Sequence, residues 1–275
     1  LQEVKKLARD RAKSVSIRVP QLKDCKTHLD KKRGKGEESM IFLTEGQSAA
    51  GSIVSCRDVQ TQAIFVLKGK PLNVWDLKRD IVYKNDEMYN LMCALDIENN
   101  LEGLRYEKVI LATDADVDGL HIRNLLITYF FKFFEQLVHD GHLFVLETPL
   151  FRVRNKEKTT YCYSEAERDA ASAKLGGRAS GTGVSPVSSG QSQDNLETHG
   201  RDARATRKLE ITRFKGLGEI SPNEMKQFIG KEMRLSQVEH APKSSASDIL
   251  GFYMGKNTPE RKDYIMENLV VPVED

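Results

Sequence analysis

The first half of the chain alternates between short apolar runs and longer amphipathic segments. Apolar runs of this length, bounded by polar and small residues, are typical of buried strands. The apolar runs lie at 40–43, 63–67 and 108–113, and helices are expected at 46–56, near 85–95 and from about 120 to 139. Strands that alternate with helices form parallel sheets with both faces covered. The pattern therefore predicts an α/β fold built on a parallel sheet.

The second half has a different pattern. After residue 150 the strands become shorter, and helices are expected near 222–230 and 259–269, which indicates a smaller α+β region. Residues 176–206 are rich in Gly, Ser and polar side chains and have no periodicity. We expect them to form a disordered insertion whose removal leaves stability almost unchanged, because long loops add little closure entropy.

The start of the chain indicates a larger parent protein. Its first residue is Leu rather than Met, and Leu1, Val4 and Leu7 have helical spacing, so we expect the end of a helix that continues from a missing upstream part. Residues 20–39 are a polar connector. The chain has no signal-peptide core and no apolar run long enough for a bilayer, so we expect a cytoplasmic protein without a membrane partner.

The amino-acid composition argues against only a few kinds of site. The 275 residues include 42 Lys and Arg against 40 Asp and Glu, a net charge of +2, so any nucleic-acid contact must come from a local basic face. The four cysteines form no C-x-x-C pair, which argues against a zinc site or a disulfide framework and favours a reducing compartment.

The strongest chemical signal is T-D-A-D-V-D-G, directly after the strand at 108–113. In an extended segment residues two apart point the same way, so Asp114, Asp116 and Asp118 would converge at the carboxyl end of a strand. Open α/β sheets bind ligands at that edge. Three carboxylates held close repel one another unless a cation neutralises them, which predicts a hard divalent metal.

Two alternatives to this metal site can be weighed on the sequence. The spacing D-x-D-x-D-G also opens an EF-hand calcium loop, but the twelfth position is Leu125 rather than Glu, and a strand rather than a helix precedes it. Acidic residues that only cap a helix starting near Leu120 would explain one Asp but not three in alternation.

A second acidic position lies at the end of another apolar run. Glu45 closes the strand at 40–43 and is followed by G-Q-S-A-A-G-S, small residues that allow a sharp turn and close helix packing. Alone, this pattern is as often structural as catalytic. Because parallel strands end on the same edge of a sheet, we expect Glu45 to lie near Asp114.

Basic residues follow two of the same strands. Lys68 and Lys70 come just after the strand at 63–67, where their ammonium groups could approach phosphates, although lysines in turns are usually only solvated. His121 and Arg123 lie at the start of the long helix, whose N-terminus favours anions; for His121 a helix start without a ligand is the alternative.

A glycine-containing turn, R-F-K-G-L-G-E, occupies residues 213–219. It pairs basic residues with two glycines. A tight helix start is the alternative interpretation, since Ser221 and Pro222 begin a helix well.

In this order, T-E-G-Q-S-A, L-K-G-K-P-L-N, T-D-A-D-V-D-G-x-H-I-R and R-F-K-G-L-G-E resemble the motifs of the B subunits of bacterial gyrase and topoisomerase IV, the type IIA DNA topoisomerases. The sequences L-F-R-V-R-N-K-E-K-T-T-Y-C-Y and E-I-T-R-F-K-G-L-G-E-I-S-P look closer to the topoisomerase IV type. The resemblance covers nearly the whole chain outside 171–207. It implies a helix and linker from a transducer domain at 1–36, a TOPRIM domain with a Rossmann-like sheet at 37–150, and a tail region at 151–275.

The resemblance also implies roles for individual residues. Glu45 and Asp114 would bind the catalytic metal, and Asp116 and Asp118 would help to hold Mg²⁺, which Mn²⁺ or Ca²⁺ can replace for binding. Lys68 would join Glu45 and Asp114 in the catalytic set, near cleaved DNA and the inhibitor pocket of the family. The implied DNA contacts are Lys68, Lys70, His121 and Arg123. One departure is Gln47, where the bacterial pattern usually reads E-G-D-S-A, which changes local charge and drug contacts.

The implied reaction is a transesterification in which a tyrosine of the partner A subunit attacks a DNA phosphorus. The partners would be double-stranded DNA and the A subunit in an A2B2 heterotetramer, and ATP would bind only the missing N-terminal domain. Another TOPRIM enzyme, a primase or nuclease, is less compatible because it lacks L-K-G-K-P-L-N and R-F-K-G-L-G-E. A noncatalytic scaffold that holds DNA and the partner, with a structural metal, is the remaining alternative and would tolerate loss of Glu45.

Overall fold

The computed structural model describes residues 19–30, 33–98, 100–175, 209–239 and 243–269. The helix expected at the start of the chain and the insertion expected at 176–206 lie outside these residues. The chain divides into two compact units, one formed by Leu1–Thr148 with Lys215–Asp275 and the other by Pro149–Phe214.

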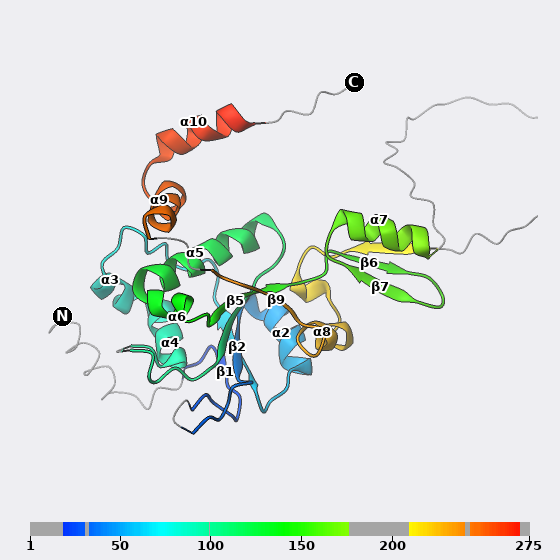
Figure 1. Ribbon diagram of the computed structural model, residues 1–275, viewed down its shortest axis with the longest axis horizontal. Coiled ribbons are helices and arrows are strands. Elements are labelled where there is room, and N and C mark those ends of the chain that lie inside the picture. The colour runs from blue at the N-terminus through cyan, green and yellow to red at the C-terminus, as the bar shows by residue number, and fades with distance from the viewer. Residues whose placement is uncertain (1–18, 31–32, 99, 176–208, 240–242, 270–275) are drawn as a thin grey trace, which may run out of the picture. The chain divides into compact units, whose positions relative to one another are not determined.

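A six-stranded sheet is the centre of the first unit, with the order β1-β3-β2-β4-β5-β9 (Figure 1). The strands are β1 (Leu22–Lys23), β2 (Met40–Glu45), β3 (Gln62–Leu67), β4 (Lys108–Ala112), β5 (Leu143–Glu147) and β9 (Arg234–Gln237). Strands β3, β2, β4 and β5 run parallel, whereas β1 and β9 pair antiparallel at the two edges. The expected α/β class with a parallel-rich sheet is confirmed.

Helices cover both faces of this sheet, with α2 and α8 on one side and α4 and α5 on the other (Figure 1). The helical elements are α2 (Gly46–Cys56), α3 (Arg79–Lys84), α4 (Asp86–Leu95), α5 (Val117–Phe133), α6 (Glu135–His139), the 3₁₀ helix η1 (Leu217–Glu219), α8 (Pro222–Phe228), α9 (Lys243–Met254) and α10 (Thr258–Asn268). None of the helices in the described residues is long and apolar enough to cross a membrane.

The apolar runs are continuous because both pleats of the central strands are buried. Ile41 and Leu43 pack into the core with residues of α4 and α5. Phe42, on the opposite pleat, is in register with Ile64 and Ile110, and all three are fully buried. A strand buried on both faces shows an unbroken apolar run rather than alternation.

The long helix expected at about 120–139 is two helices. Helix α5 starts earlier, at Val117, and it ends at Phe133 because Phe134 adopts φ −138° and ψ 43°, outside the helical region. Helix α6 follows directly. The aromatic residues around this break belong to the core, since Tyr129, Phe130 and Phe134 are buried.

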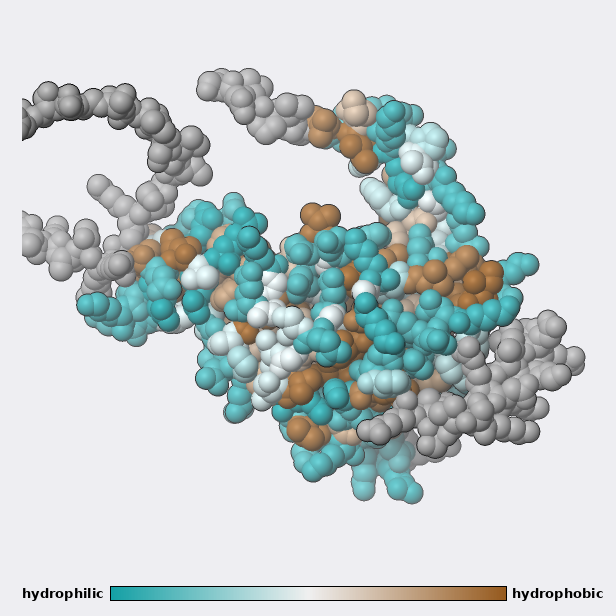
Figure 2. Space-filling model, turned by 180° about the vertical axis from the view of Figure 1, so that it is seen from behind, coloured by the Kyte–Doolittle hydropathy of each residue, from teal (hydrophilic) through white to brown (hydrophobic). Residues whose placement is uncertain are grey.

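The face that Figure 2 shows is mainly hydrophilic, with apolar residues among the polar ones. Several of the large apolar side chains that are exposed belong to α9 and α10, namely Ile249, Tyr253, Tyr264, Ile265 and Met266. Helix α10 has no buried residue. Single exposed apolar residues are common on folded proteins, so the scattered ones elsewhere indicate no particular function.

The second unit is a small antiparallel sheet with one helix. Its strand order is β7-β6-β8. The elements are β6 (Phe151–Arg154), β7 (Thr159–Cys162), α7 (Glu165–Lys174) and β8 (Glu210–Arg213). Phe151, Val153, Cys162 and Ala171 form its buried core, and the hydroxyl of Ser164 caps α7 by accepting from the backbone N–H of Glu167 at 3.1 Å.

Candidate metal centre

Strands β2 and β4 lie side by side, but the connections that follow them lead in opposite directions along the sheet. Strand β2 continues through α2 to β3 on one side, and β4 continues through α5 to β5 on the other. In open α/β sheets this switch in direction places the ligand site at the carboxyl ends of the two strands. Glu45 is the last residue of β2, and Asp114 follows two residues after the end of β4. The structure therefore brings Glu45 and Asp114 to the same edge, as expected.

The acidic motif reaches this edge by a different geometry from the expected one. Strand β4 ends at Ala112, and Asp116 is already the N-cap of α5, so Asp118 lies in the first helical turn. Strand alternation therefore does not make the three carboxylates converge, and that expectation was wrong. The Asp116 Oδ1 accepts a hydrogen bond from the backbone N–H of Gly119 at 2.7 Å, so capping accounts for one Asp of the motif.

The glycine that closes the motif is required by close backbone packing. A Cβ on Gly119 would lie 2.8 Å from the carbonyl carbon of Asp114, closer than carbon atoms pack. Any larger residue would therefore push the start of α5 away from the turn that carries Asp114.

Each aspartate has its own nearest partner. Asp114 is half-buried, and its Oδ1 accepts a hydrogen bond from the backbone N–H of Leu217 at 2.8 Å. Asp118 is exposed and pairs with the Lys70 Nζ at 2.6 Å. Among the described residues these carboxylates do not form a group of three with ligand atoms within 4.8 Å of one another. The acidic groups thus surround the strand ends without forming a closed cage.

Burial and mutual repulsion both act on the carboxyl groups at this edge, and Lys70 offsets only part of the repulsion. Burial raises the pKa of Glu45, and repulsion from Asp114, Asp116 and Asp118 raises it further. Burial also raises the pKa of Asp114, with smaller contributions from Asp116 and Glu219, although the Leu217 N–H opposes this shift. A cation bound among these groups would relieve both shifts.

The donor set fits Mg²⁺. All the candidate ligand atoms are carboxylate oxygens, which hard divalent cations prefer, and Mg²⁺ commonly uses only one or two protein carboxylates while it keeps several waters. An open arrangement with Glu45 and Asp114 nearest the strand ends is compatible with that coordination. The assignment of Glu45, Asp114, Asp116 and Asp118 as ligands remains a prediction.

The expected basic residues are not equivalent. Lys68 follows β3 directly, its side chain is exposed, and its backbone N–H donates to the Glu87 Oε1 at 2.6 Å. Lys70 faces the acidic groups, since it pairs with Asp118 and its own pKa is raised by that contact. A DNA contact by Lys70 would therefore compete with this ion pair.

The other two expected DNA-binding residues lie on α5. His121 is exposed, and it is close enough to Asp118 to contribute to the lowered pKa of that carboxyl, although Lys70 is the larger cause. Arg123 is half-buried, and its guanidinium donates to the Thr113 Oγ1 at 3.5 Å. Burial lowers the pKa of Arg123, which is consistent with a guanidinium turned toward the protein.

The sequence reasoning missed one contributor to the site, the turn that contains Gly216 and Leu217. The sequence pattern showed basic residues and two glycines in a turn, with a tight helix start as the alternative interpretation. The helix start is confirmed, since Ser221 and Glu224 form a capping box and Pro222 occupies the first turn of α8. The contact of this turn with Asp114 is a backbone interaction across the fold, and the paired glycines were its only signal.

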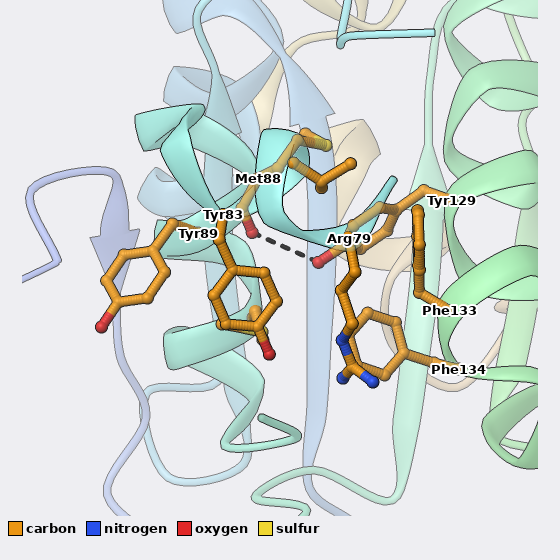
Figure 3. Close-up of a pocket in the computed structure, with 9 residues that line it drawn as sticks. Arg79, Tyr83, Met88, Tyr89, Tyr129, Phe133 and Phe134 are labelled. Carbon is orange, nitrogen blue, oxygen red and sulfur yellow. Dashed lines mark hydrogen bonds between the residues drawn. The ribbon is translucent and has the colours of Figure 1, made fainter. Parts of the chain in front are cut away.

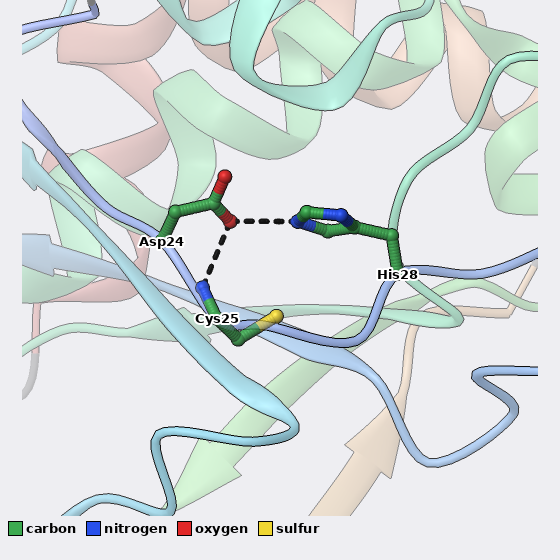
Figure 4. Close-up of side chains that lie close together, drawn as sticks. All are labelled: Asp24, Cys25 and His28. Carbon is green, nitrogen blue, oxygen red and sulfur yellow. Dashed lines mark hydrogen bonds and ion pairs between the residues drawn. The ribbon is translucent and has the colours of Figure 1, made fainter.

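A second cluster of ligand-type side chains lies in the segment around β1 (Figure 4). One ligand atom each of Asp24, Cys25 and His28 lies within 4.8 Å of the others. However, the Arg105 guanidinium pairs with Asp24 and lies 2.8 Å from the His28 Nε2, so a cation is already present. Burial and the Asp24 charge also raise the pKa of the Cys25 thiol, which disfavours the thiolate that metals bind. This cluster is a structural network.

A shallow pocket lies between α3, α4 and α5 (Figure 3). The Arg79 guanidinium lies 5.5 Å from the centre of the Phe134 ring, and the Tyr129 hydroxyl donates to the Met88 carbonyl at 3.2 Å. The enclosed space is of the order of a single water molecule. In this structure the pocket is therefore too small for a substrate.

Comparison with known proteins gives consistent matches. The Toprim domain family matches residues 40–148, and the family described as DNA gyrase B subunit, carboxyl terminus, matches residues 206–266. The chain is 51% identical over 98% of its length to the B subunit of DNA topoisomerase 4 from Borreliella burgdorferi, of which it covers 40%. It is 33% identical over 90% of its length to the B subunit of DNA gyrase from Thermus thermophilus, of which it covers 35%.

A solved structure shares the fold. The DNA-binding, cleavage and re-ligation domain of Plasmodium falciparum topoisomerase II superposes with a TM-score of 0.68 over 93% of this chain and 32% of that one, at 23% identity. The chain thus spans less than half the length of the relatives that it matches.

Proposed function

Because the chain belongs to the type IIA topoisomerase B subunits, whose Toprim and carboxyl-terminal domains it carries, we propose that its acidic edge holds the Mg²⁺ used in DNA cleavage and religation. The nucleophilic tyrosine would come from a partner A subunit, and the substrate would be double-stranded DNA. The observation that supports this most directly is the position of Glu45 and Asp114 at the switch point of the sheet, with the pKa of both raised.

In this proposal the residues of the site have different roles. Glu45 and Asp114 hold the metal, and Asp116 and Asp118 add negative charge that favours a divalent cation. When bound, the ion stabilises charge on the departing 3′ oxygen of the cleaved strand. Lys68, exposed after β3, is free to approach the phosphate backbone.

Proton transfer is a further role for Glu45. When the tyrosine oxygen bonds to phosphorus and the bond from phosphorus to the 3′ oxygen breaks, that oxygen requires a proton. As an alternative to holding the ion in its ionised form, a protonated Glu45 would donate this proton in cleavage and accept it again in religation, while the proton of the tyrosine hydroxyl passes to solvent.

Isosteric substitutions in this chain, combined with a cognate A subunit, test this proposal. Glu45→Gln and Asp114→Asn should each reduce Mg²⁺-dependent cleavage of supercoiled plasmid by on the order of a hundredfold, because each removes a charge that holds the ion. Folding should be unaffected, since neither side chain belongs to the apolar core.

A matched control uses the same chemistry at the other end of β4. Glu107 lies immediately before β4, so Glu107→Gln changes a carboxylate to an amide away from the candidate site. It should cleave at the wild-type rate. Wild-type cleavage by Glu45→Gln or Asp114→Asn would instead favour a noncatalytic scaffold with a structural metal.

A further inference from the structure

The loop before α8, Lys215–Glu219, contacts the part of the edge that carries Asp114. The backbone N–H of Leu217 donates to the Asp114 Oδ1. Gly216 lies against the same carboxylate, because a Cβ on Gly216 would lie 2.7 Å from the Asp114 Cγ and 3.0 Å from Oδ1. The loop therefore leaves the carboxylate little freedom to rotate on this side.

The same loop contacts the turn that follows Glu45. A Cβ on Gly218 would lie 2.5 Å from the Ser48 Oγ and 3.3 Å from the Ser48 Cβ. Ser48 is in the first turn of α2, which begins directly after Glu45. The two glycines of R-F-K-G-L-G-E thus lie against the two separate chain segments that supply the candidate ligands.

The loop is itself fixed in place. The side chain of Leu217 and that of Ile220 are 1% and 2% exposed, so both are anchored in the core. The Glu219 carboxylate accepts a hydrogen bond from the backbone N–H of Lys215 at 2.9 Å, which closes the loop on itself. An anchored loop can hold its neighbours in position, whereas a mobile one cannot.

We propose that the loop Lys215–Glu219 is the positioning element of the metal centre: the Leu217 N–H and Gly216 orient the Asp114 carboxylate, and Gly218 sets the spacing to the segment that carries Glu45. The inference rests on the proposed function only in taking Asp114 and Glu45 as metal ligands. Hydrogen bonds from groups behind a ligand fix its orientation, and losing them typically lowers metal affinity about ten- to a hundredfold.

The test measures metal binding by the whole purified chain, with Mg²⁺ followed by calorimetry and Mn²⁺ by electron paramagnetic resonance. Gly216→Ala should weaken binding about tenfold or more, because the added methyl group displaces the Asp114 carboxylate. Gly51→Ala is the matched control, since a Cβ there meets nothing within 4 Å. It should bind metal as the wild type does.

A second pair of variants covers the case in which Gly216→Ala fails to fold. Gly218→Ala should also weaken binding, and adding Ser48→Ala should restore part of the affinity, because it removes the oxygen atom that the new methyl group would meet. Thermal unfolding without metal verifies that each variant is folded. If the loop had only a structural role, the variants would change the melting temperature without this pattern of lost and restored metal affinity.

The outcomes separate the two proposals. If wild type and Asp114→Asn bind metal equally, the proposed function fails. If Asp114→Asn loses affinity while folded Gly216→Ala, or Gly218→Ala, binds as wild type, the positioning inference is overturned. In the reconstituted enzyme, Gly216→Ala should raise the Mg²⁺ concentration for half-maximal cleavage, while cleavage at saturating Mg²⁺ recovers.

Discussion

At the scale of single residues, the candidate site contains several acidic groups, and Lys70 compensates part of their negative charge. Lys70 pairs with Asp118 at an exposed position, and its charge also lowers the pKa of Glu45 slightly. Lys70 therefore compensates part of the charge that a metal ion would compensate. Its contribution is limited, because exposed ion pairs are screened by solvent and salt.

Removal of this lysine should strengthen metal binding. Lys70→Ala is expected to tighten Mn²⁺ binding by about two- to fivefold at low salt, with the gain shrinking as salt is added. Lys68→Ala is the matched control, since no ion pair joins its side chain to the acidic groups in the described part of the chain. Weaker Mn²⁺ binding by Lys70→Ala would show that the ammonium group organises the site instead of competing with the ion.

The pH dependence of metal binding follows from Glu45 and Asp114. The pKa of each is raised above its ordinary value, 4.5 for Glu45 and 3.8 for Asp114. A raised carboxyl pKa stabilises the metal-free fold below the ordinary pKa, and this contribution is lost as pH rises through the folded value. Bound metal reverses the preference, because it requires the ionised form.

We therefore expect the increase in melting temperature caused by Mg²⁺ to disappear on acidification at a higher pH than ordinary carboxylates would give. The measurement is a series of thermal melts with and without Mg²⁺ between neutral pH and pH 4. Asp114→Asn should show a smaller increase throughout. An increase that persists unchanged down to pH 4 would contradict the assigned ligands.

The sequence allowed prediction of the ionisable residues but not of their partners. Glu45 and Asp114 follow apolar strands, so their common edge could be inferred from strand order alone. The pairing of Asp118 with Lys70 and the contact of Leu217 with Asp114 join positions that are far apart in the chain. Such contacts depend on the tertiary fold, which local patterns do not specify.

At the scale of elements, the polar network around Asp24 ties the segment of β1 to the residues that lead into β4. Asp24 accepts a hydrogen bond from the Tyr106 hydroxyl at 2.6 Å, contacts His28 at 2.9 Å, and pairs with Arg105. Burial alone would raise the pKa of Asp24, but these hydrogen bonds outweigh it and lower the pKa to about 2.

This network should stabilise the fold in a pH-dependent way. Because the pKa of Asp24 is lowered from 3.8, its contribution is present above that value and is lost as pH falls toward about 2. Asp24→Asn should lower the free energy of unfolding at pH 7 by about 1 to 2 kcal/mol, allowing for the partial exposure of the side chain.

Urea unfolding should show that the difference in the free energy of unfolding between Asp24→Asn and the wild type becomes smaller from pH 4 to pH 2. Asp30→Asn, which affects a surface ion pair with Arg33 at 3.6 Å, should cost much less. A constant difference across this pH range would show that Asp24 acts through packing and not through its charge.

The boundaries of strands that are buried on both faces were predicted well, whereas the edge strands of the sheet were predicted poorly. Strands β2, β3 and β4 have unbroken apolar runs, whereas β1 and β9 have two and four residues with little apolar content. Their pairing is set by the neighbouring strand. The break between α5 and α6 was also missed, because Phe134 has ordinary helical propensity and no Gly or Pro marks the position.

At the scale of the whole molecule, this chain is proposed to supply the metal site but not the nucleophile. The chain contains 8 tyrosines, none in a motif that resembles the nucleophile of the family. Attack on phosphorus requires a tyrosine oxygen in line with the leaving oxygen and about 3 Å from phosphorus. The proposed activity therefore depends on a partner that places its tyrosine beside Glu45 and Asp114.

The most direct measurement identifies which protein becomes attached to DNA. The purified chain, a cognate A subunit, Mg²⁺ and supercoiled plasmid are mixed without ATP, trapped with denaturant, and analysed for protein linked to the 5′ ends. The account predicts a low level of adduct on the A subunit, none with the chain alone, and strong reduction with Asp114→Asn. An adduct on a tyrosine of this chain, or undiminished adduct with Asp114→Asn, would contradict it.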